Sequence, residues 1–136
     1  MTTDSPDHTP VHTPGARRIL VVDDNESSAM TLSWAMEMYG YEVRTCYDGF
    51  SAVEIAENFH PEIVLLDIGM PVMDGYEVCR RLRENPALCG TRVVAQTGWG
   101  DAETRRRTQE AGFDEHMTKP LDLWALKDML DKTTPH

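Results

Sequence analysis

The sequence predicts an α/β protein whose parallel sheet is covered by helices on both faces. The first observation is the apolar run 63–66, which is partly β-branched and is followed by Asp67 and turn residues. Such a run is typical of a strand that is buried on both faces. The second observation is a regular alternation of similar runs with helical patterns, which predicts parallel strands joined by helical crossovers. Together they favour a doubly wound sheet.

The elements follow one another from residue 17 onward. The expected strands cover 17–24, 42–47, 62–67, 91–96 and 115–118. The expected helices cover 25–39, 51–58, 76–83, 102–111 and 121–132. Gly40 and Gly112 follow two of these helices, as is typical of residues that end a helix. Asp48 and Gly49 form an expected turn, and Thr97 begins the loop after the fourth strand.

Length and composition predict one globular domain. The 136 residues are enough for a single core. The composition, with 40% hydrophobic and 26% charged residues, is ordinary for a folded protein. We expect the domain to cover 17–132. Residues 1–16 are rich in Thr, Pro, Asp and His and are expected to form a disordered tail, and 133–136 a short C-terminal tail.

The net charge of −10 argues against a nucleic-acid surface and against docking on an anionic membrane. No apolar run approaches the roughly 20 residues of a membrane helix. Residues 1–16 have no Lys or Arg and no apolar centre, so they do not resemble a secretory signal. Cys46, Cys79 and Cys89 lack metal-type spacing, and we expect free thiols in a cytoplasmic protein.

Polar residues follow four of the expected strands. Right-handed crossovers place the carboxyl ends of all parallel strands at one edge of the sheet. This edge is where open α/β sheets bind ligands. Taken alone, Asp67 is better explained as a helix cap or a turn residue. The convergence favours a functional site made of the following residues: Asp23, Asp24, Asp67, Thr97 and Lys119.

The chemistry of these side chains indicates a cation and a phosphoryl group. Three carboxylates at one edge repel one another unless a cation neutralises them or a proton stays bound. Mg²⁺ accepts one or two carboxylates and leaves room for a phosphate oxygen. Lys119 and Thr97 add an ammonium group and a hydroxyl donor, which suit phosphoryl oxygens. A carboxylate can itself act as the nucleophile and form an aspartyl phosphate.

With these residues, the sequence resembles a known family, the receiver domain of two-component response regulators, over about 17–132. The resemblance depends on these motifs: Asp23-Asp24, Leu65-Leu66-Asp67-x-x-Met70-Pro71-x-Met73-Asp74-Gly75, Thr97 and Lys119-Pro120. The stretch 111–120 is most similar to receivers attached to hybrid histidine kinases. The resemblance implies a flavodoxin-like sheet with strand order 2-1-3-4-5.

The resemblance also implies roles in a Mg²⁺-dependent phosphorelay. Asp67 would accept a phosphoryl group from a histidine kinase or a histidine phosphotransfer protein. Thr97 and Lys119 would bind phosphoryl oxygens, and the bond before Pro120 is expected to be cis. The protein would be no enzyme in the usual sense, although it would catalyse its own phosphorylation and dephosphorylation.

The magnesium ligands implied by the resemblance are the carboxylates of Asp24 and Asp67 and the backbone carbonyl of Gly69. Asp23 would act mainly through water. No output domain follows Lys132 in the sequence, so we expect a stand-alone regulator, with a piece of a longer protein as the alternative.

Three positions depart from the family pattern. His116 stands where the family usually has an aromatic switch residue, and either a switch or a plain exposed histidine fits it. Gly69 replaces a larger polar residue. Gly98 and Trp99 follow Thr97, and Trp99 occupies a position that tunes phosphate hydrolysis in the family.

Two other functions are compatible with parts of the pattern. A receiver-like binding module that is never phosphorylated would tolerate losses among the acidic, hydroxyl and lysine positions, yet all are filled. A phosphohydrolase of the haloacid-dehalogenase type would have an acid two residues after its nucleophile, where this chain has Gly69.

The first helix has a second apolar stripe, formed by Met30, Trp34 and Met38 at a spacing of four residues. A helix with one core-facing side does not need it, and exposed apolar patches commonly mark contact surfaces. We expect the stripe to contact a partner protein or a second copy of the chain. The alternative is that the tail, or the last helix with Trp124, covers it.

Overall fold

The predicted fold class is confirmed. The computed structural model describes residues 17–98, 100, 102–119 and 122–132. The sheet has five parallel strands in the order β2-β1-β3-β4-β5. The strands are β1 (Arg18–Val22), β2 (Glu42–Cys46), β3 (Ile63–Asp67), β4 (Arg92–Thr97) and β5 (Glu115–Thr118).

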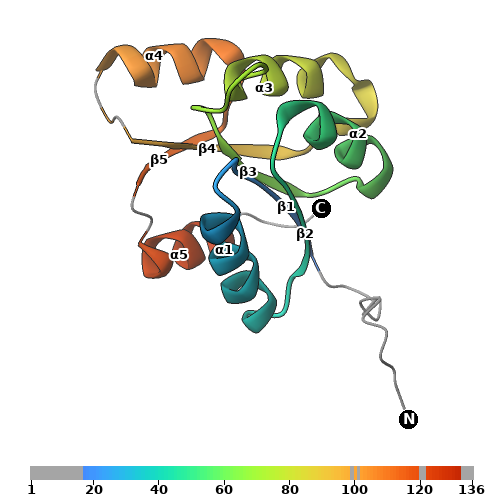
Figure 1. The fold of residues 1–136 in the computed structure, drawn as a ribbon, viewed down its shortest axis with the longest axis vertical. Coiled ribbons are helices and arrows are strands. Elements are labelled where there is room, and N and C mark those ends of the chain that lie inside the picture. Colours follow the sequence, from blue (N-terminus) through green and yellow to red (C-terminus); the bar gives the residue numbers. More distant parts are fainter. Residues whose placement is uncertain (1–16, 99, 101, 120–121, 133–136) are drawn as a thin grey trace.

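The helices form two layers, one on each face of the sheet (Figure 1). Helices α1 and α5 lie on one face, and α2, α3 and α4 lie on the other. The helices are α1 (Glu26–Met38), α2 (Gly49–Phe59), α3 (Gly75–Glu84), the short 3₁₀ helix η1 (Pro86–Leu88), α4 (Ala102–Ala111) and α5 (Leu123–Lys132).

Each face of the sheet has its own apolar core, and β3 contributes to both. Its five residues are all buried. Ile63 and Leu65 pack with residues of α1 and α5, whereas Val64 and Leu66 pack with residues of α2 and α3. Successive side chains of a strand point to opposite faces, which explains why this central strand is apolar from Ile63 to Leu66.

Several details differ from the expected elements, and β1 covers only Arg18–Val22 of the expected strand 17–24. Strand β4 continues through Thr97, which pairs with Thr118 instead of starting a loop. Helix α2 begins at Gly49, because the Asp48 side chain caps it by accepting from the Ser51 backbone N–H at 2.7 Å. Helix η1 was not expected, and a proline at its start together with the Asn85 cap accounts for it.

The register of the sheet brings the carboxyl ends of β1, β3 and β4 to one edge. Leu66 lies opposite Val22, and Asp67 lies opposite Gln96. The Asp23 N–H donates to the Cys46 carbonyl at 3.2 Å, and the Lys119 N–H donates to the Thr97 carbonyl at 2.7 Å. These bonds extend the ladder past the strands and fix where the polar side chains of the edge begin.

The α1 stripe lies exposed, as expected, with Met30, Trp34 and Met38 at 42%, 60% and 85% exposure. Its contact with a partner or a second copy stays a prediction. Cys46 and Cys79 are buried and Cys89 is exposed, and all three are free thiols. Within the described residues, none of the helices is both long enough and apolar enough to span a membrane.

Candidate functional site

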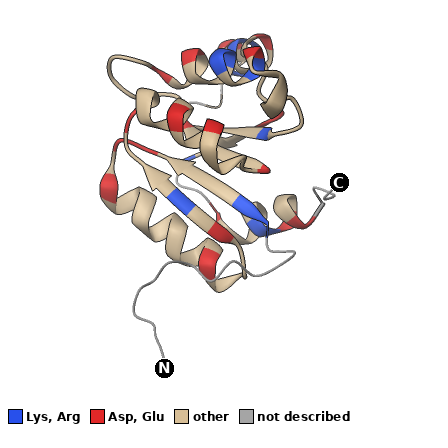
Figure 2. Ribbon diagram, turned by 90° about the vertical axis from the view of Figure 1, so that its right-hand side faces the viewer, with Lys and Arg blue, Asp and Glu red and all other residues tan. Residues whose placement is uncertain are grey.

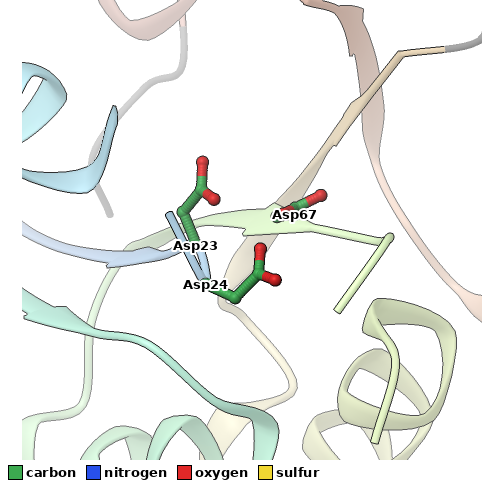
Figure 3. Close-up of side chains that lie close together, drawn as sticks. All are labelled: Asp23, Asp24 and Asp67. Carbon is green, nitrogen blue, oxygen red and sulfur yellow. The ribbon is translucent and has the colours of Figure 1, made fainter. Parts of the chain in front are cut away.

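Three carboxylates meet at the edge of the sheet where β1 and β3 end (Figure 3). Asp23 and Asp24 directly follow β1, and Asp67 is the last residue of β3. One carboxylate oxygen of each lies within 4.8 Å of the others. Asp23 and Asp67 are buried, at 1% and 6% exposure, whereas Asp24 is exposed. The cluster therefore has two fixed members and one that faces solvent.

Lys119 bridges the two buried carboxylates. Its Nζ lies 3.3 Å from Asp23 Oδ2 and 3.4 Å from Asp67 Oδ2. The other oxygen of Asp23 accepts from the Asn25 backbone N–H at 2.9 Å. The other oxygen of Asp67 accepts from the Gly69 backbone N–H at 3.0 Å. Both carboxylates are thus oriented from two sides.

The cluster has more negative charge than Lys119 neutralises. Burial raises the pKa of Asp23, and the Asp67 charge adds to this effect, although the Asn25 N–H and Lys119 oppose it. Burial and then the Asp67 carboxyl raise the pKa of Asp24. Closely spaced carboxylate oxygens whose negative charge exceeds the nearby positive charge fit a hard divalent cation. Asp23, Asp24 and Asp67 are the residues that would hold it.

Asp24→Asn is expected to weaken Mg²⁺ binding at least about tenfold, because it removes the solvent-facing carboxylate. Mg²⁺ at 100 times its Kd should stabilise the wild type by about 2.7 kcal/mol, and a tenfold weaker affinity lowers this gain by about 1.4 kcal/mol. Thermal unfolding with and without Mg²⁺ measures both quantities. An equal gain in the wild type and the variant would exclude Asp24 as a ligand.

The same charge balance sets the pH dependence of stability without metal. Because the pKa of Asp23 and Asp24 is raised from 3.8, the folded state binds protons more tightly than the unfolded chain. The free energy of unfolding should therefore fall as pH rises through and above 3.8. Urea unfolding between about pH 4 and pH 7 tests this. The fall should be smaller in Asp24→Asn and smaller with Mg²⁺; a steeper fall with Mg²⁺ would contradict the cation assignment.

A cavity of about 410 Å³ opens beside Asp67. Thr97, buried at the end of β4, lies on its wall together with Asp67. Loop residues between β3 and α3, and residues of α3 and α4, complete the wall. The described lining residues are Asp67, Ile68, Gly69, Met70, Asp74, Tyr76, Thr97, Gly98, Thr104 and Arg107.

The structure thus brings together Asp23, Asp24, Asp67 and Lys119, and it places Thr97, Gly69 and Gly98 around the adjoining cavity. Their chemical roles stay predictions. His116 is half-buried on β5, where it lies opposite Ala95 of β4. Trp99 and Pro120, and with Pro120 the expected cis bond, lie outside the described residues.

The sequence analysis missed several lining residues, and Tyr76 and Arg107 are the two that contact each other. The Arg107 Cζ lies 4.2 Å from the centroid of the Tyr76 ring. A signal was present, because Thr104, Arg107, Thr108 and Ala111 follow the spacing of one helix face. Thr108 and Ala111 are buried, whereas Arg107 is exposed and lines the mouth of the cavity beside this face.

The fold and the site together define a class: open α/β proteins with a cluster of carboxylates and a bridging lysine at the carboxyl edge of the sheet. The sequence profile of the response regulator receiver domain matches residues 19–131. The chain therefore belongs to the response regulator receiver family, as the resemblance indicated. Receiver domains interact with histidine kinases or phosphotransfer proteins in phosphorelays and generally bind Mg²⁺ in an acidic pocket.

Three individual proteins show how far the similarity extends. Response regulator PleD of Caulobacter vibrioides is 40% identical over 105 residues, which cover 77% of this chain and 23% of PleD. The chain thus spans less than half the length of the first curated relatives that it matches, PleD among them.

Two solved structures are similar as well. Vibrio cholerae chemotaxis protein CheY4 superposes with a TM-score of 0.84 at 26% identity, covering 88% of this chain and 100% of CheY4. The receiver domain of sensor histidine kinase PA1611 from Pseudomonas aeruginosa, solved with a magnesium ion in its active site cleft, has a TM-score of 0.80 at 27% identity. The superposition covers 87% of this chain and 97% of that receiver domain.

Proposed function

We propose that this chain accepts a phosphoryl group on Asp67 from a histidine kinase or a histidine phosphotransfer protein, with Mg²⁺ as the cofactor. The observation that supports this most directly is the position of Asp67. Its buried carboxylate ends the central strand, has Lys119 at 3.4 Å, and shares a cluster with Asp23 and Asp24.

The surroundings of Asp67 suit nucleophilic attack on phosphorus. The Gly69 N–H holds Oδ1 at 3.0 Å, and Lys119 lies near Oδ2. In transfer, charge gathers on the peripheral phosphoryl oxygens, which positioned donors stabilise. Lys119 supplies an ammonium group, and Thr97 supplies a hydroxyl on the cavity wall. Bound Mg²⁺ would add charge neutralisation, held by Asp24 and Asp67 with the Gly69 carbonyl, while Asp23 acts through water.

The partners are expected to be proteins. The net charge of −10 disfavours nucleic acid and anionic membranes as direct partners and fits a cytoplasmic signalling protein. The exposed stripe of Met30, Trp34 and Met38 offers an apolar contact surface for the phosphodonor protein or for a second copy.

Incubation with acetyl phosphate and Mg²⁺, followed by intact mass, tests the proposed function. One added phosphoryl group that persists for minutes supports a phosphoacceptor. The absence of an adduct would favour a receiver-like binding module. Rapid release of inorganic phosphate without a lasting adduct would favour a phosphohydrolase. Transfer from the histidine kinases and phosphotransfer proteins of the source organism would then identify the donor.

A further inference from the structure

A basic side chain of α4, Arg107, forms part of the wall of the cavity beside Asp67. Among the described residues that line the cavity, Arg107 is the only basic one, while Asp67 and Asp74 are acidic. Lys119, which contacts Asp67, does not line it. The volume of about 410 Å³ is large enough for a small molecule. The cavity therefore combines an acceptor carboxylate with a separate positive charge.

Arg107 is exposed, and its guanidinium packs on an aromatic ring. The guanidinium lies over the Tyr76 ring of α3, with Cζ 4.2 Å from the ring centroid. Tyr76 is buried and meets the Phe113 ring edge to face, at 6.3 Å between centroids. A cation over a packed ring is stabilised and loses little further freedom when it binds an anion. Arg107 is thus a positioned charge.

The neighbouring arginines are used elsewhere. Arg105 donates to the Gly100 carbonyl at 3.2 Å, and Arg106 pairs with Glu103 and Glu110 on the surface of α4. Figure 2 shows that Lys and Arg positions gather in the layer of α3 and α4, although the chain as a whole is acidic. Of the run 105–107, only Arg107 lines the cavity.

We propose that Arg107 selects among small-molecule phosphodonors, by binding the carboxylate that leaves when an acyl phosphate phosphorylates Asp67. This inference rests on the proposed function of Asp67. An acyl phosphate approaching this edge meets the charges of Asp23 and Asp24, and the guanidinium of Arg107 offsets that repulsion. Guanidinium groups also match carboxylates with paired hydrogen bonds.

The step balances without a further reactant. A carboxylate oxygen of Asp67 forms a bond to phosphorus while the bond between phosphorus and the acyl oxygen breaks. The electron pair of the broken bond stays on the acyl oxygen, which leaves as a carboxylate, and no proton is transferred. Arg107 stabilises the negative charge that grows on this oxygen. Phosphoramidate loses neutral ammonia instead, so its transfer should not depend on Arg107.

The test compares phosphorylation rates from acetyl phosphate and from phosphoramidate, both with Mg²⁺. Arg107→Gln should lower the acetyl phosphate rate about five- to tenfold and change the phosphoramidate rate less than about twofold. Arg107→Lys, which keeps the charge but loses the paired geometry, should fall between. Arg106→Gln is the matched control, because it removes the same charge from the same helix outside the cavity, and both its rates should stay at the wild-type level.

The phosphoramidate rate also serves as a control for folding, since a misfolded variant loses both activities. Equal rates for Arg107→Gln and the wild type with both donors would overturn the inference and leave the proposed function intact. So would an equal loss with both donors when thermal unfolding shows that the variant is folded, or the same donor-specific loss in Arg106→Gln. A wild type that accepts phosphate from neither donor would overturn the proposed function itself.

Discussion

Asp67→Asn is expected to abolish phosphoryl uptake, lowering the rate from acetyl phosphate at least about 100-fold. The substitution keeps the shape of the side chain, and the Asn carbonyl can still accept from the Gly69 N–H. The uncharged amide is no nucleophile, however, and it removes one carboxylate from the cation cluster. Lys119 keeps Asp23 as its partner, so the edge of the sheet should stay folded.

Intact mass spectrometry after incubation with acetyl phosphate and Mg²⁺ measures this effect. Asp74→Asn is a suitable control, because Asp74 lines the same cavity but caps α3 by accepting from the Glu77 N–H at 3.0 Å. Asn caps helices about as well as Asp. The control should therefore label within about twofold of the wild type. Wild-type labelling of Asp67→Asn, or loss of labelling in Asp74→Asn alone, would show that Asp67 is not the acceptor.

The fold could be predicted because its main signals are local. The run 63–66 is apolar on both sides of the strand, so both sides must be covered, and the alternation with helical patterns indicates that helices cover them. The order of the strands has no such local signal. It followed from the resemblance to a family, and the structure confirms it.

The acidic residues at the edge of the sheet could be predicted as a group, but the environment of each carboxylate could not. Asp23 and Asp24 are adjacent in sequence, and nothing local distinguishes them. In the structure the Asp23 N–H donates to the Cys46 carbonyl and so extends the hydrogen bonds between β1 and β2. The Asp23 carboxylate points toward Lys119, whereas Asp24 faces solvent. This difference arises from β2 and from the segment after β5, which are both distant in sequence.

Arg107 and Tyr76 show the same limit. The spacing of α4 could place Arg107 beside the inner face of its helix, but not above a ring of α3. That contact depends on how two helices pack on one face of the sheet. The need for glycine at position 49 also depends on tertiary packing, since an added Cβ there would be 2.9 Å from the Met73 Cβ.

Gly75→Ala is expected to destabilise the protein by about 3 kcal/mol or more. Gly75 is the first residue of α3, directly behind the loop that follows Asp67. A Cβ at this position would lie 2.5 Å from the Ile68 Cα and 2.8 Å from the Asp67 carbonyl oxygen. Both atoms belong to the backbone, so no side chain can rotate away, and either the loop or α3 must shift.

The shift would also disturb the site, because the loop displaced by the new methyl group includes Gly69, whose N–H orients Asp67. We therefore expect phosphorylation to fall together with stability when both are measured, by urea unfolding and by labelling with acetyl phosphate. Gly90→Ala is the matched control, since an added Cβ there meets no atom within 4 Å. Its stability should stay within about 1 kcal/mol of the wild type. Equal stability and equal labelling of Gly75→Ala and Gly90→Ala would contradict the idea that close packing at Gly75 positions Asp67.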